Sequence, residues 1–230
     1  MNLWNSVLDF LLPRYCKVCG RRLDAGEVHM CVPCFLGMPC LDYDMNGLSP
    51  AEKILMTERQ VVRAASMMQY DKDSHYRNLL YNMKYYNKPK VGTWLAGIGA
   101  RRLQSKGFFE GVDCIVPVPL SKRKQRRRGY NQCSFIARGV SGVIGLPVVE
   151  NAVVRDVEKV RQAGLGKYQR WDNAEGLFRV AEPGVLAGRH ILLVDDVMTT
   201  GSTLCSMIET IAAAVPDIKI SVFTLGIVEV

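Results

Sequence analysis

The chain has 230 residues, enough for one α/β domain and a small accessory module. Hydrophobic residues make up 48% of it, so we expect a packed core and exclude a largely disordered protein. The net charge of +8 favours anionic partners, namely nucleotide phosphates, pyrophosphate or nucleic acid, without choosing among them.

The first residues, 1–13, are apolar but lack the basic region and the small-residue cleavage site of a signal peptide. We expect a short amphipathic helix packed on the protein, with a weak membrane or partner contact as the alternative. No apolar run reaches the length of a transmembrane helix. The sequence therefore predicts a cytoplasmic protein, and in a reducing compartment paired cysteines favour metal binding over disulfides.

Two Cys-x-x-Cys motifs follow in close succession. Their four thiolates suit one tetrahedral Zn²⁺ ion in a closed, structural site, with the ligands Cys16, Cys19, Cys31 and Cys34. A redox or disulfide pair is the alternative, because thioredoxin-like motifs share the same spacing. Cys40 and His29 stand close enough in the sequence to replace one ligand.

The segment 46–60 shows little pattern and is interpreted as a linker between a zinc module, 1–45, and an α/β domain, 61–230. Periodicity predicts strands over 60–70, 112–118, 146–154, 191–194 and 218–230, and helices over 75–87, 90–106, 131–144 and 204–215. The remaining cysteines fall within these elements and are expected as small core residues: Cys114, Cys133 and Cys205.

A basic run follows the second expected strand. It consists of Lys122, Arg123, Lys124, Arg126, Arg127 and Arg128, interrupted by Gln125. Such a run repels itself, so it needs solvent or an anion around it. We therefore expect either a solvated loop or a loop that holds pyrophosphate or a nucleic-acid backbone.

The most informative stretch runs from Ile191 to Thr203. Four apolar residues predict a strand buried on both faces, and Asp195 and Asp196 follow at its C-terminal end, where open α/β sheets bind ligands. Five residues then lead into an amphipathic helix: Thr199, Thr200, Gly201, Ser202 and Thr203. Their backbone N–H groups and the helix N-terminus suit a phosphate. A nucleotide-binding P-loop is excluded because no Gly-x-x-x-x-Gly-Lys-Ser/Thr motif is present. An ordinary strand, turn and capped helix is the remaining alternative.

This stretch resembles the phosphoribosyl pyrophosphate (PRPP) signature of the type I phosphoribosyltransferases. The resemblance implies a Rossmann-type, mainly parallel sheet. It also implies that Asp195 and Asp196 bind the ribose hydroxyls with Mg²⁺ and that 199–203 bind the 5′-phosphate. By position, Pro119, Leu120 and Ser121 resemble the pyrophosphate loop of that family, and 155–176 resemble its mobile lid, with an ordinary surface loop as the alternative.

The whole pattern, from the cysteine motifs through the basic run to the PRPP signature, resembles the ComF family, which includes proteins named GntX. The resemblance implies a role in competence, DNA uptake or the use of external DNA, with single-stranded DNA and uptake-machinery proteins as partners. It leaves two functions open: a PRPP-dependent glycosyltransferase with an unknown acceptor, or a non-catalytic adaptor that senses PRPP or a nucleotide. We identify no general acid or base from the sequence.

Overall fold

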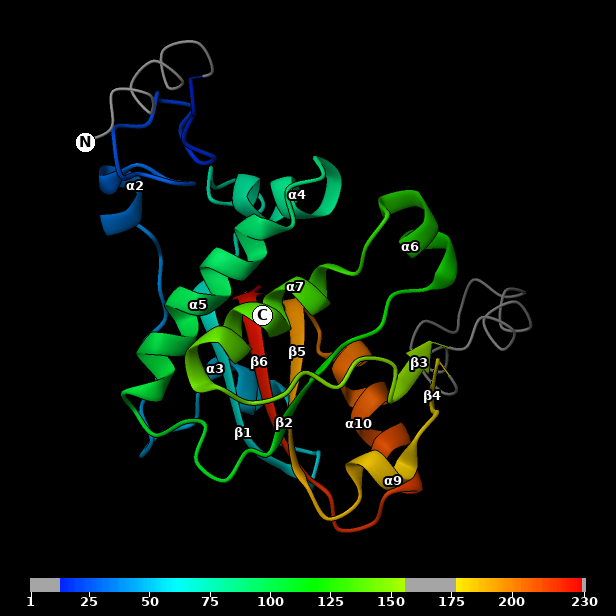
Figure 1. Cartoon of the computed structure of the whole chain (residues 1–230). Helices are drawn as coiled ribbons and strands as arrows, with labels where there is room; N and C mark the ends of the chain where they lie inside the picture. The colour runs from blue at the N-terminus through cyan, green and yellow to red at the C-terminus, as the bar shows by residue number, and fades with distance from the viewer. Residues whose placement is uncertain (1–12, 156–176, 229–230) are drawn as a thin grey trace.

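The computed structural model describes residues 13–155 and 177–228. The expected N-terminal helix lies almost wholly outside the described residues, and so does the expected lid. Within the described chain, a four-stranded parallel sheet has the order β1-β6-β5-β2 (Figure 1). Its strands are β1 (Val61–Gln69), β2 (Cys114–Pro117), β5 (His190–Met198) and β6 (Lys219–Ile227). The mainly parallel α/β fold is therefore confirmed.

Helices cover both faces of this sheet (Figure 1). One face packs against α4 (Arg77–Tyr85), α5 (Lys90–Gln104) and α7 (Gln132–Ile144). The other packs against α3 (Pro50–Ile54) and α10 (Ser202–Ala214). Successive side chains of a strand point to opposite faces, and β5 shows this directly. Leu192 and Val194 belong to the first core cluster, whereas Ile191 and Leu193 belong to the second.

A small antiparallel pair lies beside the main sheet. It consists of β3 (Val153–Arg155) and β4 (Phe178–Val180), and a short helix, α9 (Pro183–Leu186), follows it. The prediction of a strand over 146–154 is thus wrong for most of that segment. Val148 makes an isolated parallel bridge with Ile115, and only the end of the segment enters β3.

The basic run is a helix, α6 (Lys122–Arg128), so the expectation of a loop is wrong. The Ser121 hydroxyl accepts a hydrogen bond from the Lys124 N–H at 3.4 Å and caps the start. Gly129 ends the helix in the left-handed conformation, with φ of 83°. Lysine and arginine are good helix formers, and most of these side chains reach into solvent, where their repulsion is screened.

The segment expected as a linker also contains a helix. Ser49 and Glu52 form a reciprocal capping box at the start of α3, and Pro50 occupies the first turn. Ala51 and Leu55 are buried in the second core cluster. This segment therefore forms part of the α/β domain rather than a tether.

The cysteine-rich region packs directly on the α/β domain and contains the short helix α2 (Val32–Leu36). Cys16, Val18 and Cys31 belong to the same core cluster as α4 and α5. The Tyr76 hydroxyl, at the start of α4, donates a hydrogen bond to the Cys34 carbonyl at 2.8 Å. None of the helices in the described part of the chain is both long and apolar enough to cross a membrane.

Candidate functional site

The two acidic residues lie on β5, which continues through them to Met198 rather than ending at Val194 as expected. The parallel ladder with β6 explains the extra length, because Asp195 is aligned with Thr224 and Met198 with Ile227. Gly201 then precedes α10 in the left-handed conformation, with φ of 77°. The acids still stand at the carboxyl end of a central strand, the usual place for ligands in such sheets.

Both oxygens of Asp196 have partners. Lys84, near the end of α4, places its Nζ 2.8 Å from Oδ1, and the exposed fractions of the two side chains are 23% and 8%. Gln132, at the start of α7, donates from Nε2 to Oδ2 at 2.6 Å. The Arg128 guanidinium donates in turn to the Gln132 Oε1. Helices α4, α6 and α7 thus converge on one carboxylate.

Asp195 lies in a different electrostatic setting. Burial, together with the neighbouring charge of Asp196, raises its pKa to about 6. The buried Cys133 thiol donates to Asp195 Oδ1 at 3.2 Å. Burial and the two carboxylates raise the pKa of that thiol, so it stays protonated and acts as a donor. Burial alone would lower the pKa of Lys84, but its attraction to Asp196 outweighs this and raises it.

A cleft of about 210 Å³ opens over these carboxylates. Besides Lys84, three further basic side chains line it: Lys124 and Arg128 from α6 and Arg155 from β3. Pro119 and Leu120 of the expected pyrophosphate loop line it as well, while Ser121 caps α6. The cleft thus combines basic side chains with two carboxylates, which suits a ligand with both phosphate and hydroxyl groups.

The residues expected to bind the 5′-phosphate lie next to this cleft. Thr203 lines it directly, whereas Thr199, Thr200 and Ser202 are exposed in the adjoining turn. The Thr200 hydroxyl donates to the Ser202 hydroxyl at 3.2 Å. Among the basic residues of α6, Lys124 and Arg128 line the cleft, and all except Arg128 are exposed: Lys122, Arg123, Lys124, Arg126 and Arg127.

Sequence reasoning missed three residues of this site. The sequence assigns no role in the site to Lys84 or Gln132, which fall within the expected helices 75–87 and 131–144. Cys133 was expected as a core residue; it is buried, but its thiol also contacts Asp195. The one available signal was the Asn131 cap, which fixes the start of α7 and so brings Gln132 and Cys133 to the carboxyl edge of the sheet.

Gly201 offers a direct test of how tightly the turn 199–203 packs against its surroundings. A Cβ at this position would lie 2.5 Å from the Ile54 Cγ2 of α3, and the backbone conformation disfavours any L side chain. We expect Gly201→Ala to lower the free energy of unfolding by about 2 kcal/mol or more, from strain plus collision with a stiff branched side chain.

Gly188→Ala is the matched control for this variant. Gly188 has a similar φ of 70° but nothing within 4 Å of its Cβ position, so only the backbone strain applies. Urea denaturation of both variants measures the difference. Equal losses of stability would contradict the close approach of α3 to the turn 199–203.

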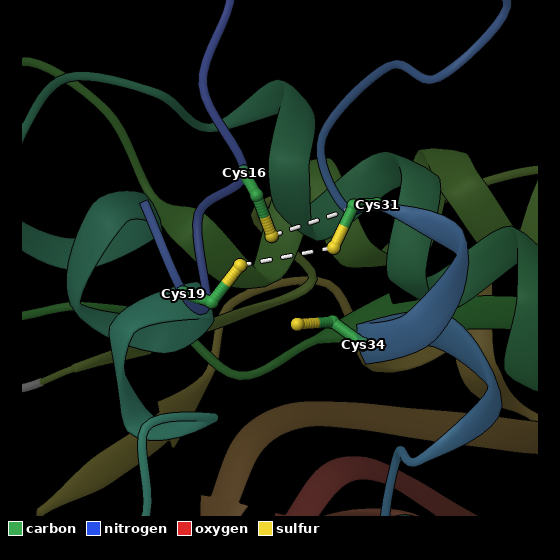
Figure 2. A group of neighbouring side chains, drawn as sticks. All are labelled: Cys16, Cys19, Cys31 and Cys34. Carbon is green, nitrogen blue, oxygen red and sulfur yellow. Dashed lines mark hydrogen bonds between the residues drawn. The ribbon is translucent and has the colours of Figure 1, made fainter. Parts of the chain in front are cut away.

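The four cysteine sulfurs of the zinc module converge on one point (Figure 2). All lie within 4.8 Å of one another, and the sulfurs of Cys19 and Cys31 are 3.7 Å apart. Tetrahedral ligands at a Zn–S distance of about 2.3 Å would be separated by about 3.8 Å. The arrangement therefore fits a single four-thiolate zinc ion.

Further details of the cluster agree with this donor set. The backbone N–H groups of Val18 and Cys31 both donate to the Cys16 sulfur at 3.4 Å, and such bonds favour a thiolate. The two alternative ligands stand apart. The His29 ring packs edge-on against the Trp94 ring, with centroids 5.6 Å apart. The backbone of Cys40 forms an isolated antiparallel β-bridge with that of Met68 in β1.

Comparisons with known proteins agree with this geometry. Residues 135–226 match the family model of the phosphoribosyl transferase domain. Competence protein F of Haemophilus influenzae is 39% identical over 93 residues, which cover 40% of this chain and 41% of that protein. DNA utilization protein YhgH of Salmonella typhimurium is 26% identical over 195 residues, or 84% of this chain and 81% of that protein. The match thus spans less than half the length of the first relative.

A solved structure of a glutamine phosphoribosylpyrophosphate amidotransferase from B. subtilis is also similar. The alignment covers 62% of this chain and 30% of the amidotransferase chain, with 16% sequence identity and a TM-score of 0.41.

Proposed function

Because this chain is a homologue of Competence protein F and the DNA utilization protein YhgH and carries a phosphoribosyltransferase domain, we propose that it binds PRPP with Mg²⁺ in the cleft over β5. Its cellular role is then in DNA uptake or the use of external DNA, in the cytoplasm, together with proteins of the uptake machinery. One observation carries the proposal: two adjacent carboxylates near the end of a central parallel strand line the same cleft as four basic side chains.

The chemistry of the donors supports this ligand. Asp195 and Asp196 offer hard oxygen ligands of the kind that Mg²⁺ prefers, and they also suit the two ribose hydroxyls. Cys133 lies in the same cluster but does not fit Mg²⁺, because its thiol is protonated and soft. When bound, Mg²⁺ supplies positive charge to the pyrophosphate oxygens.

Phosphoribosyl transfer breaks the bond between ribose C1 and a pyrophosphate oxygen, and C1 forms a new bond to the acceptor. The bonding electron pair leaves with pyrophosphate. In this proposal Lys124, Arg128 and Arg155 neutralise the departing charge, while the turn 199–203 holds the 5′-phosphate. The carboxylates orient the ribose and face the positive charge that develops on it. The expected lid, 155–176, remains a prediction for the same reaction.

A second candidate function keeps the same site but makes bound PRPP a signal rather than a substrate. The exposed basic helix α6 favours this second function. Its positive side chains extend beyond the cleft and could pair with the phosphates of a nucleic-acid backbone. In this version the protein is an adaptor for single-stranded DNA or for another protein.

Titration with PRPP and Mg²⁺ in a calorimeter, beside a pyrophosphate-release assay with a panel of nucleobases, tests both candidates. We expect saturable binding of PRPP that requires Mg²⁺. Release of pyrophosphate in the presence of one of the bases supports the transferase. Binding of PRPP without release of pyrophosphate, whether a base is present or only water, supports the sensor. Absence of PRPP binding would overturn the proposed site itself.

A further inference from the structure

Three tyrosine side chains at the C-terminal end of α4 are turned to solvent. The exposed fractions of Tyr81, Tyr85 and Tyr86 are 45%, 58% and 64%. The rings of Tyr81 and Tyr85 are neighbours, with centroids 5.3 Å apart and planes inclined at 47°. The opposite side of the helix is fully buried, so these tyrosines are not needed for the core. A cluster of large exposed rings is unusual for a protein surface without a partner.

This tyrosine cluster lies beside the basic helix. The Arg128 guanidinium sits over the Tyr85 ring, 5.6 Å from its centroid. The Tyr130 hydroxyl, just after α6, donates to the Met83 carbonyl and ties the two segments together. Figure 1 shows the end of α4 and helix α6 on the same side of the molecule, beyond the carboxyl ends of the strands.

The two segments that carry this surface contain no acidic residues in their own sequence. No acidic residue occurs between Asp73 and Glu110, the stretch that contains α4. None occurs between Asp113 and Glu150, the stretch that contains α6. A flexible polyanion with flat aromatic groups is the ligand that complements both features.

We propose that Tyr81, Tyr85 and Tyr86 form a stacking platform for the bases of single-stranded DNA, while the arginines and lysines of α6 hold its phosphates. The proposal rests on the proposed role in handling single-stranded DNA and adds the residues that hold its bases and phosphates. Single strands are required because a duplex keeps the faces of its bases covered. Stacking on tyrosine is tolerant of sequence, as a protein that handles external DNA requires.

The platform adjoins the PRPP cleft. Tyr85 and Arg128 line the cleft, whereas Tyr81 and Tyr86 lie outside it. A bound strand would therefore pass along the rim of the site that holds the sugar phosphate. This separation also makes Tyr81 and Tyr86 the suitable pair for mutation, because their loss should leave PRPP binding unchanged.

The test measures fluorescence anisotropy of a labelled oligonucleotide of about 15 thymidylates. We expect Tyr81→Leu with Tyr86→Leu to weaken binding by about tenfold or more, and Tyr81→Phe with Tyr86→Phe to retain it, because phenylalanine keeps the ring. An abasic oligonucleotide with the same number of phosphates should have the same affinity for the wild type and for the leucine variant. Unchanged affinity in the leucine variant, or equal binding of abasic and base-containing strands, would overturn the proposal.

Two controls separate stacking from charge. Tyr15→Leu removes a similarly exposed tyrosine, 49% exposed, from the zinc module and should leave affinity for DNA unchanged. Arg126→Gln with Arg127→Gln should reduce the salt dependence of binding, which the tyrosine variants should leave unchanged. A tyrosine effect that is equally large for duplex DNA would contradict base stacking.

The failure of this proposal is distinguishable from failure of the PRPP site. Calorimetry with PRPP and Mg²⁺ on the same preparations should give wild-type affinity for the Tyr81→Leu, Tyr86→Leu variant. A protein that binds the oligonucleotide through these tyrosines but never binds PRPP would refute the PRPP site alone. A protein that binds PRPP with no tyrosine-dependent binding of DNA would refute the platform alone.

Discussion

Replacement of both Asp195 and Asp196 by asparagine is expected to abolish PRPP binding while leaving the protein folded. Hydrogen bonds to charged groups contribute about 1.5–3 kcal/mol each, so loss of both carboxylates should weaken binding by at least about a hundredfold. Asparagine retains the shape of the side chain and can still accept from Gln132 and Cys133. Calorimetry with PRPP and Mg²⁺ measures the loss, and urea denaturation checks the fold.

The single variants should differ in stability. Asp195→Asn removes a buried charge whose pKa is already raised to about 6, so it should cost little stability near neutral pH. Asp196→Asn deprives Lys84 of its ion pair and should destabilise the protein more. PRPP affinity of the wild type should also fall as the pH drops through about 6, because Asp195 then takes up a proton.

Asp217→Asn is the matched control. Asp217 is exposed at the opposite end of the sheet, with φ of 61°, a conformation that asparagine tolerates well. It removes the same charge without touching the cleft. If the double variant of Asp195 and Asp196 binds PRPP as the Asp217 variant does, the ribose assignment is wrong.

Loss of zinc should have the second large effect. We expect one zinc ion per chain, and we expect Cys31→Ser to lose it, because Cys31 is 1% exposed and its sulfur lies 3.7 Å from that of Cys19. Between residues 13 and 45 the structure has a single short helix, α2. Structural zinc sites contribute much of the folding free energy of such small modules. Elemental analysis and thermal unfolding, with and without a chelator, measure both consequences.

Cys40→Ser provides the comparison for the zinc variant. Cys40 belongs to the same module but lies outside the four-sulfur cluster, so this variant should keep its zinc and its melting temperature. If the protein contains no metal and still has normal stability, the assignment of a zinc site is wrong. Equal loss of zinc in the Cys40 variant would show that the ligand set is different.

The central sheet was largely predictable because its strands follow a local rule. Ile191 to Val194 are apolar without interruption, which indicates a strand covered on both faces, and the two core clusters divide these residues between them. The longer extent of β5 was not predictable, because pairing with β6 carries the strand through two acidic residues. That pairing depends on a segment distant along the chain.

The basic run shows the opposite case, in which a physical argument from sequence gave the wrong local structure. Self-repulsion predicted a loop, but the cap at Ser121 and the turn at Gly129 enclose a complete short helix. Helix propensity and capping outweigh a repulsion that solvent and salt screen. The inference about an anionic partner is unaffected, since it depends on the charge alone.

The partners of Asp196 could not be predicted from sequence at all. Lys84 and Gln132 belong to helices far from β5 along the chain, and their meeting depends on how α4 and α7 pack on the sheet. A lysine near a helix end is ordinarily read as a solvated residue that complements the helix dipole. Only tertiary structure distinguishes it from a buried counter-ion.

Helix α4 touches both halves of the molecule. At its start Tyr76 holds the Cys34 carbonyl of the zinc module, and near its end Lys84 holds Asp196. Nine residues of helix span about 14 Å, short enough to behave as a stiff rod. A displacement of the helix at Tyr76 would therefore also move Lys84 beside Asp196. Thermodynamic reciprocity then requires that any change in sugar-phosphate affinity on zinc loss be matched by an equal change in zinc affinity when the sugar phosphate is bound.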